Sequence, residues 1–197
     1  MREIEVTVKV NHSLEETIKI LKDQGFKPVE VYTINDDYMT LDYNNITKEN
    51  ALDKLKSCVL IRHLYLENNR EKKMITHKQK EYENGIAISD TKIDVIIDNT
   101  ENAIEIFKKL GLKTIVKVSD TIHVYDKGDF SIAIEDVKGL GILLEVENAN
   151  DFTGYSTEEI IKEKEKMYKE LKTLNLDLDD DYDVKKAYEL LLKNIEK

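Results

Sequence analysis

Strict alternation at the start of the chain is the feature that most constrains the fold. In MREIEVTVKV, an isoleucine or valine occupies every second position from Ile4 to Val10. A period of two, with β-branched residues at the apolar positions, predicts a strand with one buried face. The other face carries two glutamates, a threonine and a lysine. These polar groups either face water or line an interior. The pattern of one strand does not distinguish these two arrangements.

Alternation of this kind returns along the chain, in stretches such as FSIAIEDV and LLEVE, and gives about eight strands. Short polar connections predict that they pair mostly antiparallel. Amphipathic, capped segments predict helices over residues 13–24 and 157–174. The sequence therefore predicts an α+β fold, an eight-stranded antiparallel sheet that closes into a β-barrel or tunnel, with helices packed outside.

Composition limits the class of protein. The 197 residues are expected to form one domain, with C-terminal helices over 157–197 packed on or beside the barrel. Forty acidic and thirty basic residues give a net charge of -10, which argues against nucleic acid or an anionic membrane as a partner. One cysteine, and no long apolar run, predict a cytoplasmic protein. A homodimer is the default expectation for its assembly.

Paired carboxylates recur at both ends of the strand region. Glu3 and Glu5 share one strand face, as do Glu145 and Glu147. Taken strand by strand, such residues are more often a solvated face than a site. Like charges two residues apart on one face need a counterion, however, and hard oxygen ligands suit Mg²⁺ or Mn²⁺. In contrast, the acidic run DLDDD (177–181) lacks the glycine of a calcium loop and is expected to be a solvated connection between helices.

Several stretches together resemble one family. EIEVTVKV is similar to the E-x-E-x-K signature of the CYTH proteins, the triphosphate tunnel metalloenzymes that include class IV adenylate cyclases and thiamine triphosphatases. VLIR, MITHK, TKID and VKVS are similar to the family's basic strands. IEDVKGLGILLEVE matches the family's L-D-x-V-x-G-L-G-x-F-x-E-I-E, and the late AYELLL resembles S-Y-x-x-L-L.

The resemblance implies an eight-stranded tunnel that binds a small-molecule triphosphate and Mg²⁺ or Mn²⁺. By position it implies metal or metal-water ligands at Glu3, Glu5, Glu135, Glu145 and Glu147, of which Glu5 and Glu147 are the catalytic candidates. It also implies phosphate-binding cations at Lys9, Arg62, Lys78, Lys92 and Lys117. Guanidinium and ammonium groups of this kind hold phosphate oxygens through charge-assisted hydrogen bonds.

Three positions depart from the pattern. Thr7, Leu60 and Ser119 occupy slots where the family carries a basic residue. The leading expectation is a divalent-metal-dependent hydrolase of inorganic triphosphate or thiamine triphosphate. One alternative is a class IV adenylate cyclase that converts ATP to cyclic AMP and pyrophosphate. The other is a tunnel that binds phosphorylated or organic anions without catalysis, which the three lost cations favour and the retained glutamates oppose.

Overall fold

A computed structural model describes residues 4–56, 58–83, 86–148 and 150–196, with the backbone alone described over 78–83 and 86–91. The strands are β1 (Ile4–Lys9), β2 (Lys27–Thr40), β3 (Val59–Tyr65), β4 (Glu71–Glu83), β5 (Ile86–Ile96), β6 (Lys113–Lys127), β7 (Phe130–Val137) and β8 (Gly141–Asn148). The helices are α1 (Leu14–Asp23), α2 (Ala51–Lys56), α3 (Thr100–Lys109), α4 (Thr157–Lys172) and α5 (Lys186–Ile195), with a 3₁₀ turn η1 at Glu67–Asn69.

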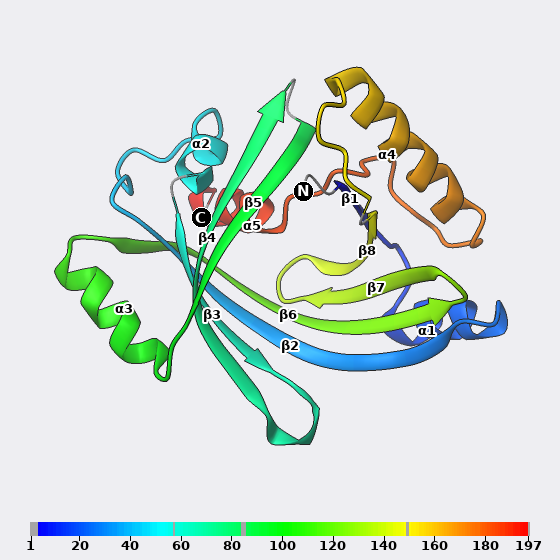
Figure 1. The fold of residues 1–197 in the computed structure, drawn as a ribbon, viewed down its shortest axis with the longest axis horizontal. Helices are drawn as coiled ribbons and strands as arrows, with labels where there is room; N and C mark the ends of the chain where they lie inside the picture. The colour runs from blue at the N-terminus through cyan, green and yellow to red at the C-terminus, as the bar shows by residue number, and fades with distance from the viewer. Residues whose placement is uncertain (1–3, 57, 84–85, 149, 197) are drawn as a thin grey trace.

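All eight strands form one antiparallel sheet, in the order β1-β8-β7-β6-β2-β3-β4-β5. The sheet is strongly curled, so that its two ends face each other across a central space (Figure 1). The predicted eight-stranded α+β tunnel fold is confirmed. Among the described strands the curl is not closed by hydrogen bonds, because β1 and β5 remain the two edges of the sheet.

Helices cover the convex face, and the sequence shows why. Helices α1 and α4 both begin with a capping box, at Ser13 with Glu16 and at Ser156 with Glu159. Their apolar sides pack with the outward residues of β1, β7 and β8 in the largest hydrophobic cluster. Helix α3 covers Met39 on β2 in a separate, smaller cluster. The alternating apolar residues of the opening stretch are therefore buried under helices.

Helix α5 does not follow the expectation that the helices lie outside. It packs on the concave face, where Ala187 and Leu190 meet Val118 of β6 and Val137 of β7. Helix α2 joins α5 there through Ala51. Figure 1 shows α5 in the middle of the curl, with the sheet around it. The inner face of β6 is apolar at these positions, so burial of a helix inside the curl removes it from water.

A segment that we call the C-terminal strap (residues 177–185) leads into α5 along the free edge of β1. The backbone N–H of Asp179 donates to the carbonyl of Lys9 at 3.0 Å, and that of Val184 donates to Thr7 at 3.0 Å. In return the N–H of Thr7 donates to the carbonyl of Tyr182 at 3.2 Å. The acidic run predicted to be a solvated connection is thus bonded to the sheet edge, because β1 has unpaired backbone groups to satisfy.

Among the described residues, none of the helices combines the length and apolar character that a membrane span requires.

Candidate functional site

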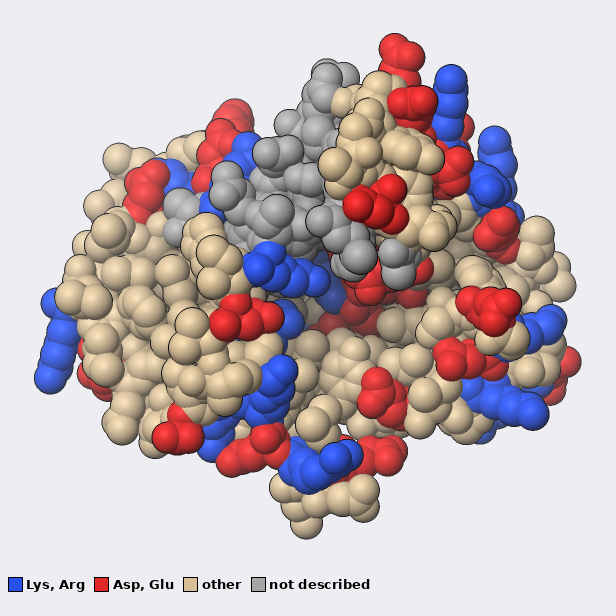
Figure 2. Space-filling view, viewed as in Figure 1, with Lys and Arg blue, Asp and Glu red and all other residues tan. Residues whose placement is uncertain are grey.

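A cavity of about 280 Å³ lies on the concave face of the sheet. Figure 2 shows the surface hollowed near its centre, with acidic atoms on one side of the hollow and basic atoms on the other. Charged residues of the lining that the structure describes are evenly divided: Glu5, Glu135, Glu145, Glu147 and Asp183 are acidic, and Lys56, Arg62, Lys92, Lys185 and Lys186 are basic. The cavity thus carries strong charges of both signs and little formal net charge.

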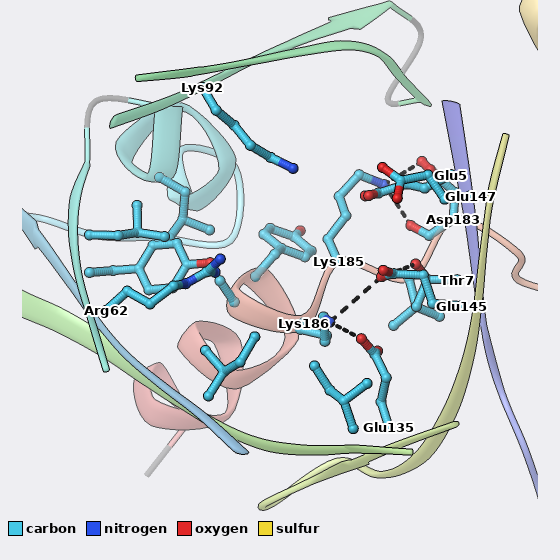
Figure 3. Close-up of a pocket in the computed structure, with 18 of the residues that line it drawn as sticks. Glu5, Thr7, Arg62, Lys92, Glu135, Glu145, Glu147, Asp183, Lys185 and Lys186 are labelled. Carbon is cyan, nitrogen blue, oxygen red and sulfur yellow. Dashed lines mark hydrogen bonds and ion pairs between the residues drawn. The ribbon is translucent and has the colours of Figure 1, made fainter. Parts of the chain in front are cut away.

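Strands β1 and β8 supply the part of the acidic wall that we call the outer pair, Glu5 and Glu147. The two residues stand directly opposite each other in the antiparallel register. Glu147 is exposed and Glu5 is half-buried. Figure 3 shows both side chains directed into the pocket, next to Lys185 and Asp183. Register alone brings together two carboxylates that are 142 residues apart in the chain.

Deeper in the same wall is a second group, the inner cluster, made of Asp120, Glu135 and Glu145. The ammonium group of Lys186 lies among them, with Nζ 2.5 Å from Glu135 Oε1, 3.3 Å from Asp120 Oδ2 and 3.6 Å from Glu145 Oε2. Thr7 donates its hydroxyl to Glu145 Oε2 at 3.2 Å. Asp120 and Glu135 are only 3% and 1% exposed, so these two carboxyl groups are shielded from water, whereas the Glu145 side chain is 25% exposed.

Proton affinities in the inner cluster follow from burial and charge. Burial, and then the charge of Glu145, raise the pKa of Glu135 well above its usual value. Burial likewise raises the pKa of Asp120, against the opposing effect of Lys186. Burial alone would lower the pKa of Lys186, but the surrounding carboxylates outweigh it and raise that pKa. Lys186 is therefore a fixed positive charge at neutral pH.

A chain of ion pairs fixes the strap beside the site. Lys164 of α4 is 1% exposed, and its Nζ lies 2.6 Å from Asp183 Oδ1. Lys185 reaches the other oxygen of the same carboxylate at 2.8 Å. A buried ammonium group is tolerated only when it is paired in this way. Asp183 thus links helix α4 to the lysine that points toward the outer pair (Figure 3).

The facing wall supplies cations and apolar surface. Arg62 of β3 donates through Nε and a terminal nitrogen to the two oxygens of Asp36, at 2.8 and 2.6 Å. This bidentate pair fixes the guanidinium plane and leaves other N–H groups for a ligand. Lys92 of β5 extends into the pocket from above Arg62 in Figure 3. Apolar and aromatic side chains complete this wall, among them Ile34, Tyr38, Leu52, Leu60 and Tyr188.

The structure brings together six of the predicted site residues, which all line this pocket: Glu5, Arg62, Lys92, Glu135, Glu145 and Glu147. Glu3 lies outside the described residues. Lys78 is described only by its backbone, which pairs with Lys92 in the β4–β5 register.

Lys9 and Lys117 are placed elsewhere. Lys9 is exposed at the end of β1 and does not line the pocket. Lys117 is 72% exposed and pairs with Asp37 at 2.9 Å. It lies on the face of β6 opposite Val118 and Asp120, because side chains on a strand alternate between faces. The inner-face positions of this strand are therefore one residue away from the expected ones.

The three departures from the family pattern have different positions. Thr7 faces the acidic wall, where its hydroxyl takes the place of a cation as a partner of Glu145. Leu60 lines the pocket beside Arg62, so an apolar group does stand in that slot. Ser119, like Lys117, lies on the other face of β6. At this point of β6 the residue on the inner face is therefore Asp120, which is acidic, and not Ser119.

Sequence reasoning missed the groups that the strap and α5 bring into the pocket. Asp183, Lys185 and Lys186 come from a region read as a solvated connection and a helix packed outside. One signal did point there, since AYELLL (187–192) resembles a family stretch and Tyr188 lines the cavity. The hydrophobic pattern of the strap does not reveal that it pairs with β1, because the pairing is made by backbone hydrogen bonds.

The outer pair has donors of the right chemistry for Mg²⁺ or Mn²⁺. Mg²⁺ keeps several waters and is usually held by one or two carboxylates together with phosphate oxygens, so two facing glutamates suffice. Within the described part of the chain, no three Asp, Glu, His or Cys side chains gather as a metal-binding group. The inner cluster, the other candidate, already has an ammonium group among its carboxylates.

Comparison with known proteins agrees with this geometry. The CYTH domain model matches residues 1–182. A Methanocaldococcus jannaschii protein named "Putative adenylate cyclase" is 28% identical over 184 residues, which cover 91% of this chain and 93% of the relative.

Solved structures share the fold at low sequence identity. The PH1819 protein of Pyrococcus horikoshii superposes with a TM-score of 0.69 at 20% identity, over 98% of this chain and 99% of that one. A Hippeastrum protein superposes with a TM-score of 0.62 at 12% identity, over 98% and 96% of the two chains. With its family signatures on the walls of one curled antiparallel sheet, the chain belongs to the CYTH domain family.

Proposed function

We propose that the protein is a divalent-metal-dependent hydrolase of triphosphate-containing small molecules, inorganic triphosphate and thiamine triphosphate being the first candidates. The observation that carries the proposal is the opposition of two walls across one cavity, with Glu5 and Glu147 on one side and Arg62 and Lys92 on the other. A triphosphate chain needs cations along its length, and the cavity lining has little net charge of its own. A bound divalent ion would supply the missing positive charge.

In this proposal the side chains mainly position charge. Glu5 and Glu147 would hold Mg²⁺ or Mn²⁺, which when bound neutralises phosphate oxygens and lowers the pKa of a coordinated water. Arg62, fixed by Asp36, would bind phosphate oxygens through its remaining N–H groups, and Lys92 would bind others. Phosphoryl transfer needs little beyond such positioning and electrostatic stabilisation.

A second candidate is cyclisation of ATP to cyclic AMP and pyrophosphate. The apolar and aromatic part of the wall, with Ile34, Tyr38 and Tyr188, favours it because inorganic triphosphate has no use for such surface. The name of the M. jannaschii relative is in line with a cyclase. The Hippeastrum protein, also named a putative adenylyl cyclase, is described as having a dominant triphosphatase activity. Both activities therefore belong in one assay.

The test is to incubate the pure protein with Mg²⁺ or Mn²⁺ and, in turn, inorganic triphosphate, thiamine triphosphate and ATP. Phosphate, pyrophosphate and cyclic AMP are measured in every reaction. We expect phosphate release that EDTA abolishes; pyrophosphate with cyclic AMP would assign the cyclase instead.

Glu158→Gln, an exposed change on α4, is the matched control for carboxylate variants of the site. Absence of all three products, combined with binding of the triphosphates by calorimetry, would contradict both enzymatic proposals and assign a binding protein.

A further inference from the structure

Lys186 is held in place by the fold. It is the first residue of α5, a helix fixed to the concave face by Ala187 and Leu190. Its side chain runs into the acidic wall in Figure 3 and is bounded there by the inner cluster. A long lysine side chain normally loses conformational freedom on being ordered, so a fixed ammonium group needs strong partners. Here it has three carboxylates.

The inner cluster has more carboxyl oxygens than the ammonium group of Lys186 can bond. Three carboxylates surround one ammonium group, which bonds one oxygen of Glu135 and one of Asp120. The second oxygens, Glu135 Oε2 and Asp120 Oδ1, are buried and without a hydrogen-bond partner. Unpaired buried acceptors are rare and costly. The cluster is therefore a strong cation site whose cation is part of the chain.

Carboxylate oxygens are the type of ligand that Mg²⁺ and Mn²⁺ prefer, and here the ammonium group of Lys186 occupies the space among them. The outer pair differs in burial, because Glu147 is exposed and Glu5 is half-buried. Lys185, and not Lys186, points toward it (Figure 3). In the buried region, the chain itself provides the cation among the carboxylates.

We propose that Lys186 is a built-in cation that takes the place of one divalent ion, so that the pocket binds one metal ion fewer than its carboxylates could hold. The inference rests on the proposed function only for the kind of metal. The inference predicts that the native protein and a variant without Lys186 differ in the number of metal ions that they bind. The proposed function predicts only that the native protein binds a metal ion. The two can therefore fail separately.

The experiment counts bound Mn²⁺ in the whole chain without substrate, from the loss of the free-ion EPR signal during titration. We expect one ion per native chain and two for Lys186→Met, which removes the charge and keeps most of the volume. Lys186→Arg retains a cation and should bind one. Lys193→Met is the matched control, because Lys193 is exposed on the same helix and contacts the carbonyl of Gly139.

Thermal unfolding gives a second readout. Without metal, Lys186→Met should unfold at a lower temperature than the native protein, because the two buried carboxyl groups of Asp120 and Glu135 then lack a cation. Added Mn²⁺ should raise that temperature by more than it does for the native protein or for Lys193→Met. If the variant is unfolded without metal, Mn²⁺ should restore the fold.

Each outcome decides the inference. Equal ion counts in the native protein and Lys186→Met would overturn it, and so would two ions in the native protein. A variant that Mn²⁺ fails to refold would also overturn it. No ion in the native protein and one in the variant would support the inference while contradicting the metal dependence of the proposed function.

Discussion

The outer pair and the inner cluster lie on the same concave face of the sheet and differ in burial. Glu147 is exposed and Glu5 is half-buried, whereas Glu135 is 1% exposed and in contact with Lys186. Solvated carboxylates remain ionised at little cost, while buried ones depend on their partners. The difference teaches that identical side chains on adjacent strands can serve chemistry in one place and folding in the other.

The largest expected effect tests the chemical half of this comparison. Glu5→Gln and Glu147→Gln each remove a negative charge from the outer pair and keep its shape. We expect triphosphate hydrolysis to fall by about 10²–10³-fold, a loss typical of removing one electrostatic contact at a reacting centre. Steady-state phosphate release measures it, with Glu158→Gln as the control. Activity within threefold of the native value in both variants would remove the outer pair from catalysis.

The free energy of unfolding should depend more on the inner cluster than on the outer pair. Glu135→Ala removes the nearest partner of Lys186 and leaves a cavity, so it should lower the free energy of unfolding by about 3 kcal/mol. Glu147→Ala, at an exposed position, should change it by less than about 0.5 kcal/mol. Urea unfolding without metal measures both. If the two variants lose equal stability, the division between the two carboxylate groups is wrong.

A cation across the pocket from the outer pair should matter for substrate and not for folding. Lys92→Ala should raise KM about tenfold, the weight of one charge-assisted contact at the low end of its range. Lys117→Ala, on the outer face of β6, should leave KM within twofold. Lys9→Ala belongs to the same comparison, because Lys9 does not line the cavity. An effect of Lys117→Ala as large as that of Lys92→Ala would show that our assignment of the faces of β6 fails.

The smallest expected effect is a pH dependence of stability. Burial raises the pKa of Glu135 above its ordinary value of 4.5, so the folded protein holds that proton more tightly than the unfolded chain. This contribution is fully present below about pH 4.5 and is lost as the pH rises through the raised pKa. Glu135→Gln cannot titrate and should flatten the pH dependence in EDTA. An equally steep dependence in that variant would assign it to other groups.

Prediction from sequence succeeded where one strand face is clearly apolar. In β1 and β8 the alternation of Val6 or Val146 with glutamates identified the inner face, and the structure places those glutamates in the pocket. In β6 both faces are apolar, since Val118 meets α5 inside while Tyr125 packs under the outer helices. Hydrophobicity then does not mark the faces, and the pattern was read one residue out of register.

The position of the strap was not predicted, for a different reason. An acidic, loop-like composition carries no sign that its backbone pairs with β1, so Asp183, Lys185 and Lys186 could not be placed in the pocket. Helix lengths, by contrast, were predicted closely: residues 13–24 against Leu14–Asp23, and 157–174 against Thr157–Lys172. Helix caps can be predicted from the local sequence, whereas the long-range pairing of a strand edge cannot.

Pairing of β1 with β8 and with the strap has a consequence for the order of events in folding. The first strand has its hydrogen-bonded partners more than 130 residues later in the chain. Contacts of such sequence separation form slowly, because a large loop must close before they gain anything. The acidic wall can therefore assemble only after β8 and the strap have been synthesised. Until then, β1 remains an unpaired strand.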